Sequence, residues 1–158
     1  MSDDAVQNTA MRNKTRAYSA RVDIEAPAAR VWRALTDNAA LARWLSPRAR
    51  CTARRGGSFT ASLDRQHDFT AHIDVFEEAR RLRLVHMPPI EVPPFDGAIV
   101  DDIVIATQGD KTILRVLGSG FPRDEPYGRF YMVRQIGWRR ALARLKVFLE
   151  KNMDVKST

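Results

Sequence analysis

The C-terminal part of the chain carries the pattern that most restricts the fold. At ~100° per residue, six large apolar side chains between residues 127 and 149 fall within one narrow stripe. These side chains are Tyr127, Tyr131, Trp138, Leu142, Leu145 and Leu149. The stripe predicts a long amphipathic helix, and a helix with one apolar side needs an apolar surface to cover.

The opposite side of this predicted helix mixes two kinds of side chain. Basic residues alternate there with apolar ones, in the order Arg129, Val133, Ile136, Arg140, Arg144, Val147 and Lys151. We interpret these charges as a solvated face, because charged side chains on the outside of a helix normally point into water.

The middle of the chain supplies the surface that the helix covers. Between residues 49 and 119, segments with alternating apolar residues are separated by turn-forming stretches at 55–57, 64–68, 78–80 and 109–111. Phe59, Ala61 and Leu63 form one such segment, and Leu82, Leu84 and His86 form another. This pattern predicts an antiparallel meander with one apolar face.

Before the meander, the chain changes from strand to helix. Alternation at Tyr18, Ala20, Val22 and Ile24 predicts a half-buried strand that begins near Tyr18. Pro27 favours the start of a helix that runs to residue 36. Asp37 or Asn38 then caps a second short helix, which Pro47 ends. The fold class is therefore α+β: a strand, two short helices, an antiparallel meander and a long C-terminal helix.

Length and composition favour one domain. The chain has 158 residues, of which 44% are hydrophobic and 28% charged, as in ordinary globular proteins. We expect a single ligand-binding domain at 17–152, a polar N-terminal tail at 1–16 and a short C-terminal tail at 153–158. The only cysteine is Cys51, and neither a signal peptide nor a membrane-spanning run is present. These features predict a cytoplasmic protein.

The positive charge does not by itself indicate a nucleic-acid partner. The formal net charge is +7, but Arg and Lys are spread over most segments of the chain. A nucleic-acid-binding protein normally gathers basic residues on one arm or one face and carries a recognisable motif. We therefore do not expect nucleic acid as a partner.

Several motifs, in their order along the chain, carry a family resemblance. They are residues 22–37 (VDIEAPAARVWRALTD), Trp44-Leu45, Gly57-Ser-Phe59, Arg81-Leu82, 112–122 (TILRVLGSGFP) and 137–150 (GWRRALARLKVFLE). Together they resemble the branch of the helix-grip superfamily named after the heat-shock-protein ATPase activator homologues. The superfamily also includes the lipid-transfer START domains, pollen allergens and aromatic polyketide cyclases.

The resemblance implies a curved antiparallel sheet wrapped around the C-terminal helix, with an internal hydrophobic cavity. One segment departs from the family pattern, a Pro-rich insertion at residues 87–97. Its four prolines cannot donate ladder hydrogen bonds, so it must be a loop. Its apolar residues Ile90, Val92 and Phe95 either close over the cavity or pack against the sheet.

Polar residues at inward positions define the candidate site. Alternation places His86 and Asp101 on the apolar face of the sheet, and the helical wheel places Arg134 and Gln135 near Trp138. Such groups need partners. Either they orient a ligand, or Arg134 and Asp101 form a buried pair with His86 and Gln135 bonded to backbone or water. The full expected ligand-binding set is Trp44, Phe59, His86, Asp101, Ile103, Tyr131, Arg134, Gln135 and Trp138.

Metal and cofactor chemistry find little support in the sequence. His67 and Asp68 lie near His72 and Asp74 in the sequence. However, alternation places His72 and Asp74 on the outer face, and the spacing of the four residues does not match a known metal-binding motif. Gly118-Ser-Gly120 lacks the third glycine of a nucleotide-binding motif. We expect no metal and no cofactor. Arg50 and Arg54 near Cys51 would lower the pKa of its thiol, but a lone cysteine is usually inert.

Three classes of function follow from these observations. The first is a non-enzymatic carrier or sensor that binds a small hydrophobic molecule, either neutral or anionic, in the internal cavity. The second is a protein-binding module that acts on a chaperone or regulator, as the family name implies. The third is a cyclase-, dehydratase- or hydrolase-like enzyme that uses His86 and Asp101 as an acid/base pair. We favour the first.

Overall fold

The computed structural model describes residues 15–64, 68–87 and 92–152. In chain order the elements are β1 (Thr15–Ile24), α2 (Ala28–Thr36), α3 (Asn38–Trp44), β2 (Arg50–Cys51), β3 (Ser58–Ser62), β4 (Asp68–Glu77), β5 (Arg81–His86), β6 (Ile99–Gln108), β7 (Lys111–Pro122) and α4 (Tyr127–Lys151). The seven strands form one antiparallel sheet in the order β1-β7-β6-β5-β4-β3-β2. This is the predicted helix-grip fold.

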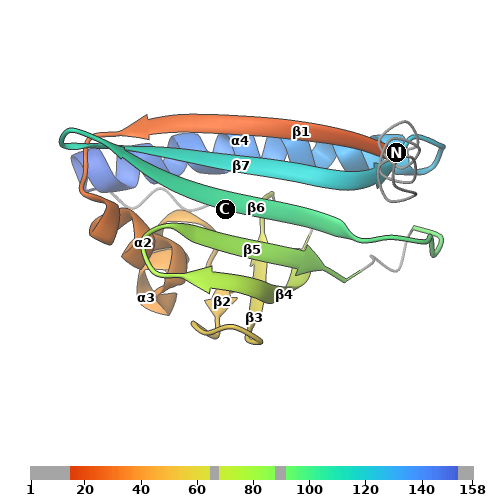
Figure 1. Ribbon diagram of the computed structural model, residues 1–158, viewed down its shortest axis with the longest axis horizontal. Coiled ribbons are helices and arrows are strands. Elements are labelled where there is room, and N and C mark those ends of the chain that lie inside the picture. The colour runs from red at the N-terminus through yellow and green to blue at the C-terminus, as the bar shows by residue number, and fades with distance from the viewer. Residues whose placement is uncertain (1–14, 65–67, 88–91, 153–158) are drawn as a thin grey trace, which may run out of the picture.

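The sheet and helices form two layers. Figure 1 shows α4 extending along β1 and β7, with α2 and α3 side by side near its C-terminal end. The two short helices begin and end as the sequence predicts. Pro27 stands at the N-cap of α2, and the side chain of Asp37 accepts a 3.0 Å hydrogen bond from the backbone N–H of Ala40 at the start of α3.

The core lies between the apolar face of the sheet and the inner side of α4. Trp138, Leu142, Leu145 and Leu149 of the predicted stripe are buried there. Gly137 lets the helix approach closely, since a Cβ atom at that position would lie 2.8 Å from Cβ of Leu63. The inward face of α4 and the end of β3 are therefore in direct contact.

The edge strand β1 is covered by side chains of α4. The hydroxyl of Tyr131 donates to the carbonyl oxygen of Ala17 at 2.9 Å, and Nζ of Lys146 donates to that of Asp23 at 2.6 Å. An exposed strand edge offers unpaired backbone groups to other chains. Here the helix satisfies two of these groups, so the edge is protected.

The N-terminal boundary differs from the expectation. Strand β1 begins at Thr15, where Thr15 pairs with Pro122 and Arg16 with Phe121. Thr15 and Arg16 therefore belong to the domain rather than to the expected tail at 1–16. Backbone pairing needs no apolar side chain, so a polar start to the strand left no alternation in the sequence. Residues 1–14 and 153–158 lie outside the described residues.

No helix in the described part of the chain combines the length and apolar character needed to cross a membrane.

Candidate functional site

The candidate site is centred on the carboxylate of Asp101. Its strand β6 alternates buried and half-buried residues, and Asp101 falls in the buried set together with Ile99 and Ile103. None of its surface is exposed. A carboxylate in such a place is stable only with hydrogen-bond donors around it.

His86, the last residue of β5, supplies the first donor. Its Nε2 atom lies 2.6 Å from Oδ2 of Asp101, and both side chains are buried. The inward position of His86 follows from the alternation along β5, in which Leu82, Leu84 and His86 are the buried residues.

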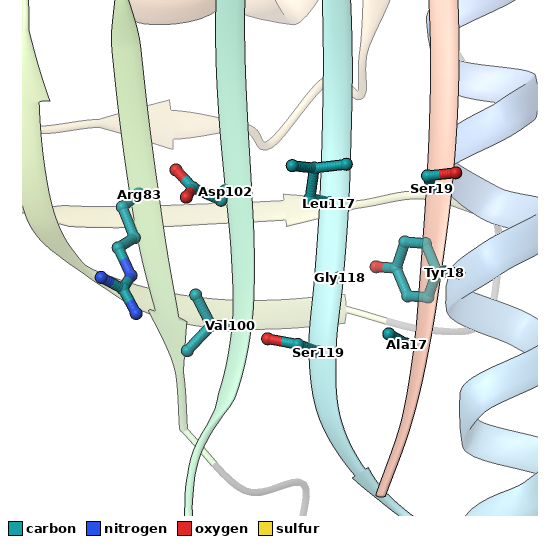
Figure 2. A pocket seen from close by; sticks show the side chains of 9 residues that line it. All are labelled: Ala17, Tyr18, Ser19, Arg83, Val100, Asp102, Leu117, Gly118 and Ser119. Carbon is teal, nitrogen blue, oxygen red and sulfur yellow. The ribbon is translucent and has the colours of Figure 1, made fainter. Parts of the chain in front are cut away.

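Tyr18 supplies a second donor from the far side of β7. Its hydroxyl donates to Oδ1 of Asp101. Tyr18 on β1 and Asp101 on β6 are both paired with Gly118 on β7, which lies between them. A Cβ atom at Gly118 would lie 2.2 Å from the Tyr18 ring, so only glycine leaves room for the ring to pass. Figure 2 shows this ring reaching from β1 toward Gly118.

Helix α4 contributes two further groups, one turn apart. The indole Nε1–H of Trp138 donates to Oδ2 of Asp101 at 3.0 Å. Arg134 places Nη1 3.9 Å from the same oxygen, and its Nη2 lies 3.3 Å from Nδ1 of His86. Side chains from β1, β5 and α4 thus meet at one carboxylate on β6.

The contacts fix the protonation state of His86. A carboxylate only accepts and a guanidinium only donates, so Nε2 must carry the proton and Nδ1 must present its lone pair. His86 is therefore neutral. In agreement, burial and the nearby charge of Arg134 lower the pKa of His86, although Asp101 opposes them.

The other groups of the cluster keep their usual charge states near neutral pH. Burial pushes the pKa of Asp101 upward, but the groups of His86, Arg134 and Tyr18 outweigh it and hold that pKa below its usual value. Burial and the Asp101 carboxylate raise the pKa of Tyr18. The cluster thus contains one carboxylate and one guanidinium, with a neutral imidazole and a neutral phenol.

Arg134 is the one group of the cluster that is incompletely satisfied. Its Nη1 atom is buried and has no hydrogen-bond partner among the described residues. The guanidinium lies over the ring of Phe69, with Cζ 4.4 Å from the centroid, and 5.4 Å from that of Phe130. Aromatic faces attract a cation but do not accept its N–H hydrogen bonds as oxygen does. This donor is therefore available to an oxygen atom.

The sequence as a whole matches one protein family. The model of the Activator of Hsp90 ATPase homolog 1-like protein family matches residues 25–150, most of the chain. The chain belongs to this family. The family model thus confirms the resemblance drawn from the motifs. No curated protein sequence matches the chain.

Solved structures similar to this Activator of Hsp90 ATPase homolog 1-like chain share its fold. MLL2253 from Mesorhizobium loti is 24% identical over 86% of this chain and 98% of its own, with a TM-score of 0.73. Aha1 from Colwellia psychrerythraea, solved as a dimer, is 17% identical over 85% and 96%, with a TM-score of 0.70. CalU16 from Micromonospora echinospora is 23% identical over 86% and 75%, with a TM-score of 0.65.

Within this family member, some expected site residues lie away from the cluster. Trp44 is fully buried and donates from Nε1 to the carbonyl oxygen of Ala34 at 2.7 Å. Ile103 is a core residue. Tyr131 donates its hydroxyl at the edge of β1, and among the described residues its ring contacts the cluster only through Tyr18, with the centroids 6.0 Å apart. Gln135 is half-buried and lies outside the hydrogen bonds around Asp101.

Two aromatic residues connect the cluster to its surroundings. Phe59, an expected site residue, stacks on Phe69 with the ring centroids 5.9 Å apart. Phe69 in turn meets the ring of His86 edge-on at 5.0 Å. Residues Tyr18, Phe69, Gly118 and Phe130 were not among the expected site residues. Gly118 was the sequence signal that could have pointed to them, because a glycine at an inward strand position often marks a place where another group approaches the backbone closely.

The described part of the Pro-rich loop packs on the start of α4. The rings of Phe95 and Tyr127 meet edge-on at 5.1 Å, and the Tyr127 hydroxyl donates to the carbonyl oxygen of Pro93 at 2.7 Å. Val92 is half-buried, while Ile90 lies outside the described residues. The loop therefore contacts the helix two turns before Arg134.

The remaining candidates have simple environments. Burial raises the pKa of Cys51 to about 11, opposite to the direction expected from Arg50 and Arg54. Both arginines are exposed, so their charges act through solvent while the thiol is desolvated. His72 and Asp74 are exposed on the outer face, as predicted, and His67 lies outside the described residues. The described residues contain no group of three or more potential metal ligands.

Proposed function

We propose that the chain is a non-enzymatic carrier or sensor for a small, mostly apolar molecule that bears a carboxylate or carbonyl oxygen. The ligand would lie between the sheet and α4, with its oxygen on Nη1 of Arg134. One observation carries the proposal: this nitrogen is buried and has no hydrogen-bond partner among the described residues.

Asp101 is a poor substitute for such a ligand. Its Oδ2 already accepts from His86 and Trp138, and its Oδ1 accepts from Tyr18. At 3.9 Å, Nη1 of Arg134 attracts this carboxylate but is too far for a hydrogen bond. A buried donor left unsatisfied costs about 1–3 kcal/mol, which an incoming oxygen would recover.

The surroundings of Arg134 suit an apolar ligand. Phe69 and Phe130 flank the guanidinium, and Phe59 extends the aromatic surface on the sheet side. Small-molecule sites typically combine apolar walls with a few polar groups that fix orientation. A hydrocarbon chain with one polar end meets both requirements.

The test compares an anionic fluorescent fatty acid with its neutral methyl ester. Arg134→Met should keep the fold but weaken binding of the acid by about 10- to 100-fold, the worth of a charge-assisted hydrogen bond, and change ester binding much less. Arg139→Met, which removes an exposed charge on the same helix, serves as the control. An equal effect of Arg134→Met on both probes would remove the anchoring role.

An acid/base enzyme is the second candidate, and the His86–Asp101 contact of 2.6 Å favours it. However, both ring nitrogens of His86 are engaged by protein groups, Nε2 by Asp101 and Nδ1 by Arg134. A general base needs a free lone pair within reach of the substrate. Native mass spectrometry of added probe distinguishes the two: a carrier releases the compound with its mass unchanged.

A further inference from the structure

The side of α4 that faces residues 63 and 64, just after β3, carries a groove that the proposed ligand site does not use. Met132 and Ile136 lie on it with 47% and 41% of their surfaces exposed, although both are large and apolar. With Leu63, Asp64, Val133 and Gly137 they line a hollow of about 270 Å³. We call this hollow the α4 groove.

Two cations stand at the ends of the α4 groove. Arg129 and Arg140 both line it, both are exposed, and neither forms an ion pair with a described residue. They are eleven positions apart, or roughly 16 Å along a helix at 1.5 Å per residue. The groove also contains one carboxylate, Asp64, so its lining carries two positive charges against one negative charge.

From this arrangement we propose that the α4 groove docks an acidic amphipathic segment of a partner protein. An apolar side chain of the partner fills the hollow over Met132 and Ile136, and carboxylates on either side of it meet Arg129 and Arg140. Short partner helices commonly place an apolar face into such a groove and gain specificity from flanking charges.

Charge and shape favour this occupant over others. A second copy would bring the same arginines against each other, in a protein whose net charge is already +7. A flat lipid surface has no protruding side chain to enter a hollow. The proposal does not rest on the ligand function, because Arg134 is buried and does not line the groove.

Fluorescence anisotropy with two labelled peptides tests the proposal on the full chain. Both peptides are amphipathic helices of about 18 residues with the same leucine face, one flanked by glutamates and the other by lysines. The acidic peptide should bind, more weakly as salt rises, and the basic peptide should not. Ile136→Ser and Arg140→Glu should each weaken binding at least about tenfold. Arg54→Glu changes an exposed residue that does not line the groove. It should leave the Kd of the acidic peptide within about twofold of the wild-type value.

Any of five results would overturn the proposal. Four of them are no binding of the acidic peptide, equal binding of both peptides, binding unaffected by Ile136→Ser and Arg140→Glu, or dimers in sedimentation that Ile136→Ser abolishes. The fifth is binding of the protein alone to phosphatidylglycerol vesicles that Ile136→Ser abolishes, which would assign the groove to a membrane surface instead. Circular dichroism of each variant establishes that the fold is intact.

Discussion

His86 and Asp101 are joined by a 2.6 Å contact that requires a neutral imidazole, because Nδ1 of the same ring faces the donor Nη2 of Arg134. Protonation would direct a second N–H at the guanidinium and place another positive charge beside it. The contact therefore links the stability of the fold to pH.

Stability should fall as the pH is lowered from about 6.5. The pKa of His86 is below its unfolded value, so the unfolded chain takes up this proton first, and the loss approaches about 1.4 kcal/mol per pH unit. The loss ends at the folded pKa of His86. Urea unfolding between pH 7.5 and 5 measures it.

His86→Gln provides the comparison, since an amide can donate to Asp101 and accept from Arg134 without titrating. It should flatten the pH dependence over this range, whereas His72→Gln on the exposed outer face should leave it as in the wild type. An unchanged slope in His86→Gln would assign the dependence to other groups.

Gly118→Ala should be far more destabilising than an ordinary glycine replacement. The new methyl group would overlap the Tyr18 ring, forcing the ring away from Asp101. We expect a loss of about 2–4 kcal/mol, combining overpacking with an unsatisfied buried carboxylate oxygen. In a Tyr18→Ala background the same substitution should cost much less. Additive effects in this double-mutant cycle would contradict the predicted overlap.

Trp138 contributes both volume and a hydrogen bond. Trp138→Ala should cost about 3–5 kcal/mol, as large buried aromatic residues do. Trp138→Phe fills most of the space but removes the donor to Asp101 at 3.0 Å, and should cost about 1–3 kcal/mol. The exposed neighbour Arg139→Ala should stay within about 0.5 kcal/mol of the wild type. Chemical denaturation measures all three, and a wild-type midpoint for Trp138→Ala would place the residue outside the core.

Removing the two side-chain donors that cover the edge of β1 should promote self-association. Tyr131→Phe with Lys146→Met leaves the carbonyl groups of Ala17 and Asp23 without their side-chain donors. An open strand edge pairs with other edges. Light scattering after size exclusion should show larger species than in the wild type at the same concentration. Lys111→Met, which removes an exposed charge near Glu25, is the control. Equal masses in all three proteins would argue that the edge is protected by other means.

Periodicity predicted the architecture because burial on one face leaves a local pattern in the sequence. In β5 and β6, polar residues stand at two positions where the alternation predicts buried apolar ones. His86 and Asp101 were identified as inward polar residues in this way. Arg134 was found in the same way from the helical wheel. Each of these inferences needed only neighbours within one element.

The rest of the site depends on register between strands. The contact between Tyr18 and Asp101 joins residues 83 positions apart and passes over Gly118, which only the pairing of β1 with β7 and β6 places between them. No local pattern encodes that alignment. Likewise, the thiol of Cys51 was assigned the wrong pKa direction because sequence proximity to Arg50 and Arg54 says nothing about burial.

Asp101 also bears on the order in which the chain can fold. Its three donors come from residues 83, 15 and 37 positions away, on β1, β5 and α4. A partly folded chain that lacks β1 or α4 must leave the carboxylate in water or pay for burying it without its donors. Such intermediates are disfavoured, so both ends of the domain join the meander in one cooperative transition. Contacts this distant in sequence also predict slow folding for a domain of this size.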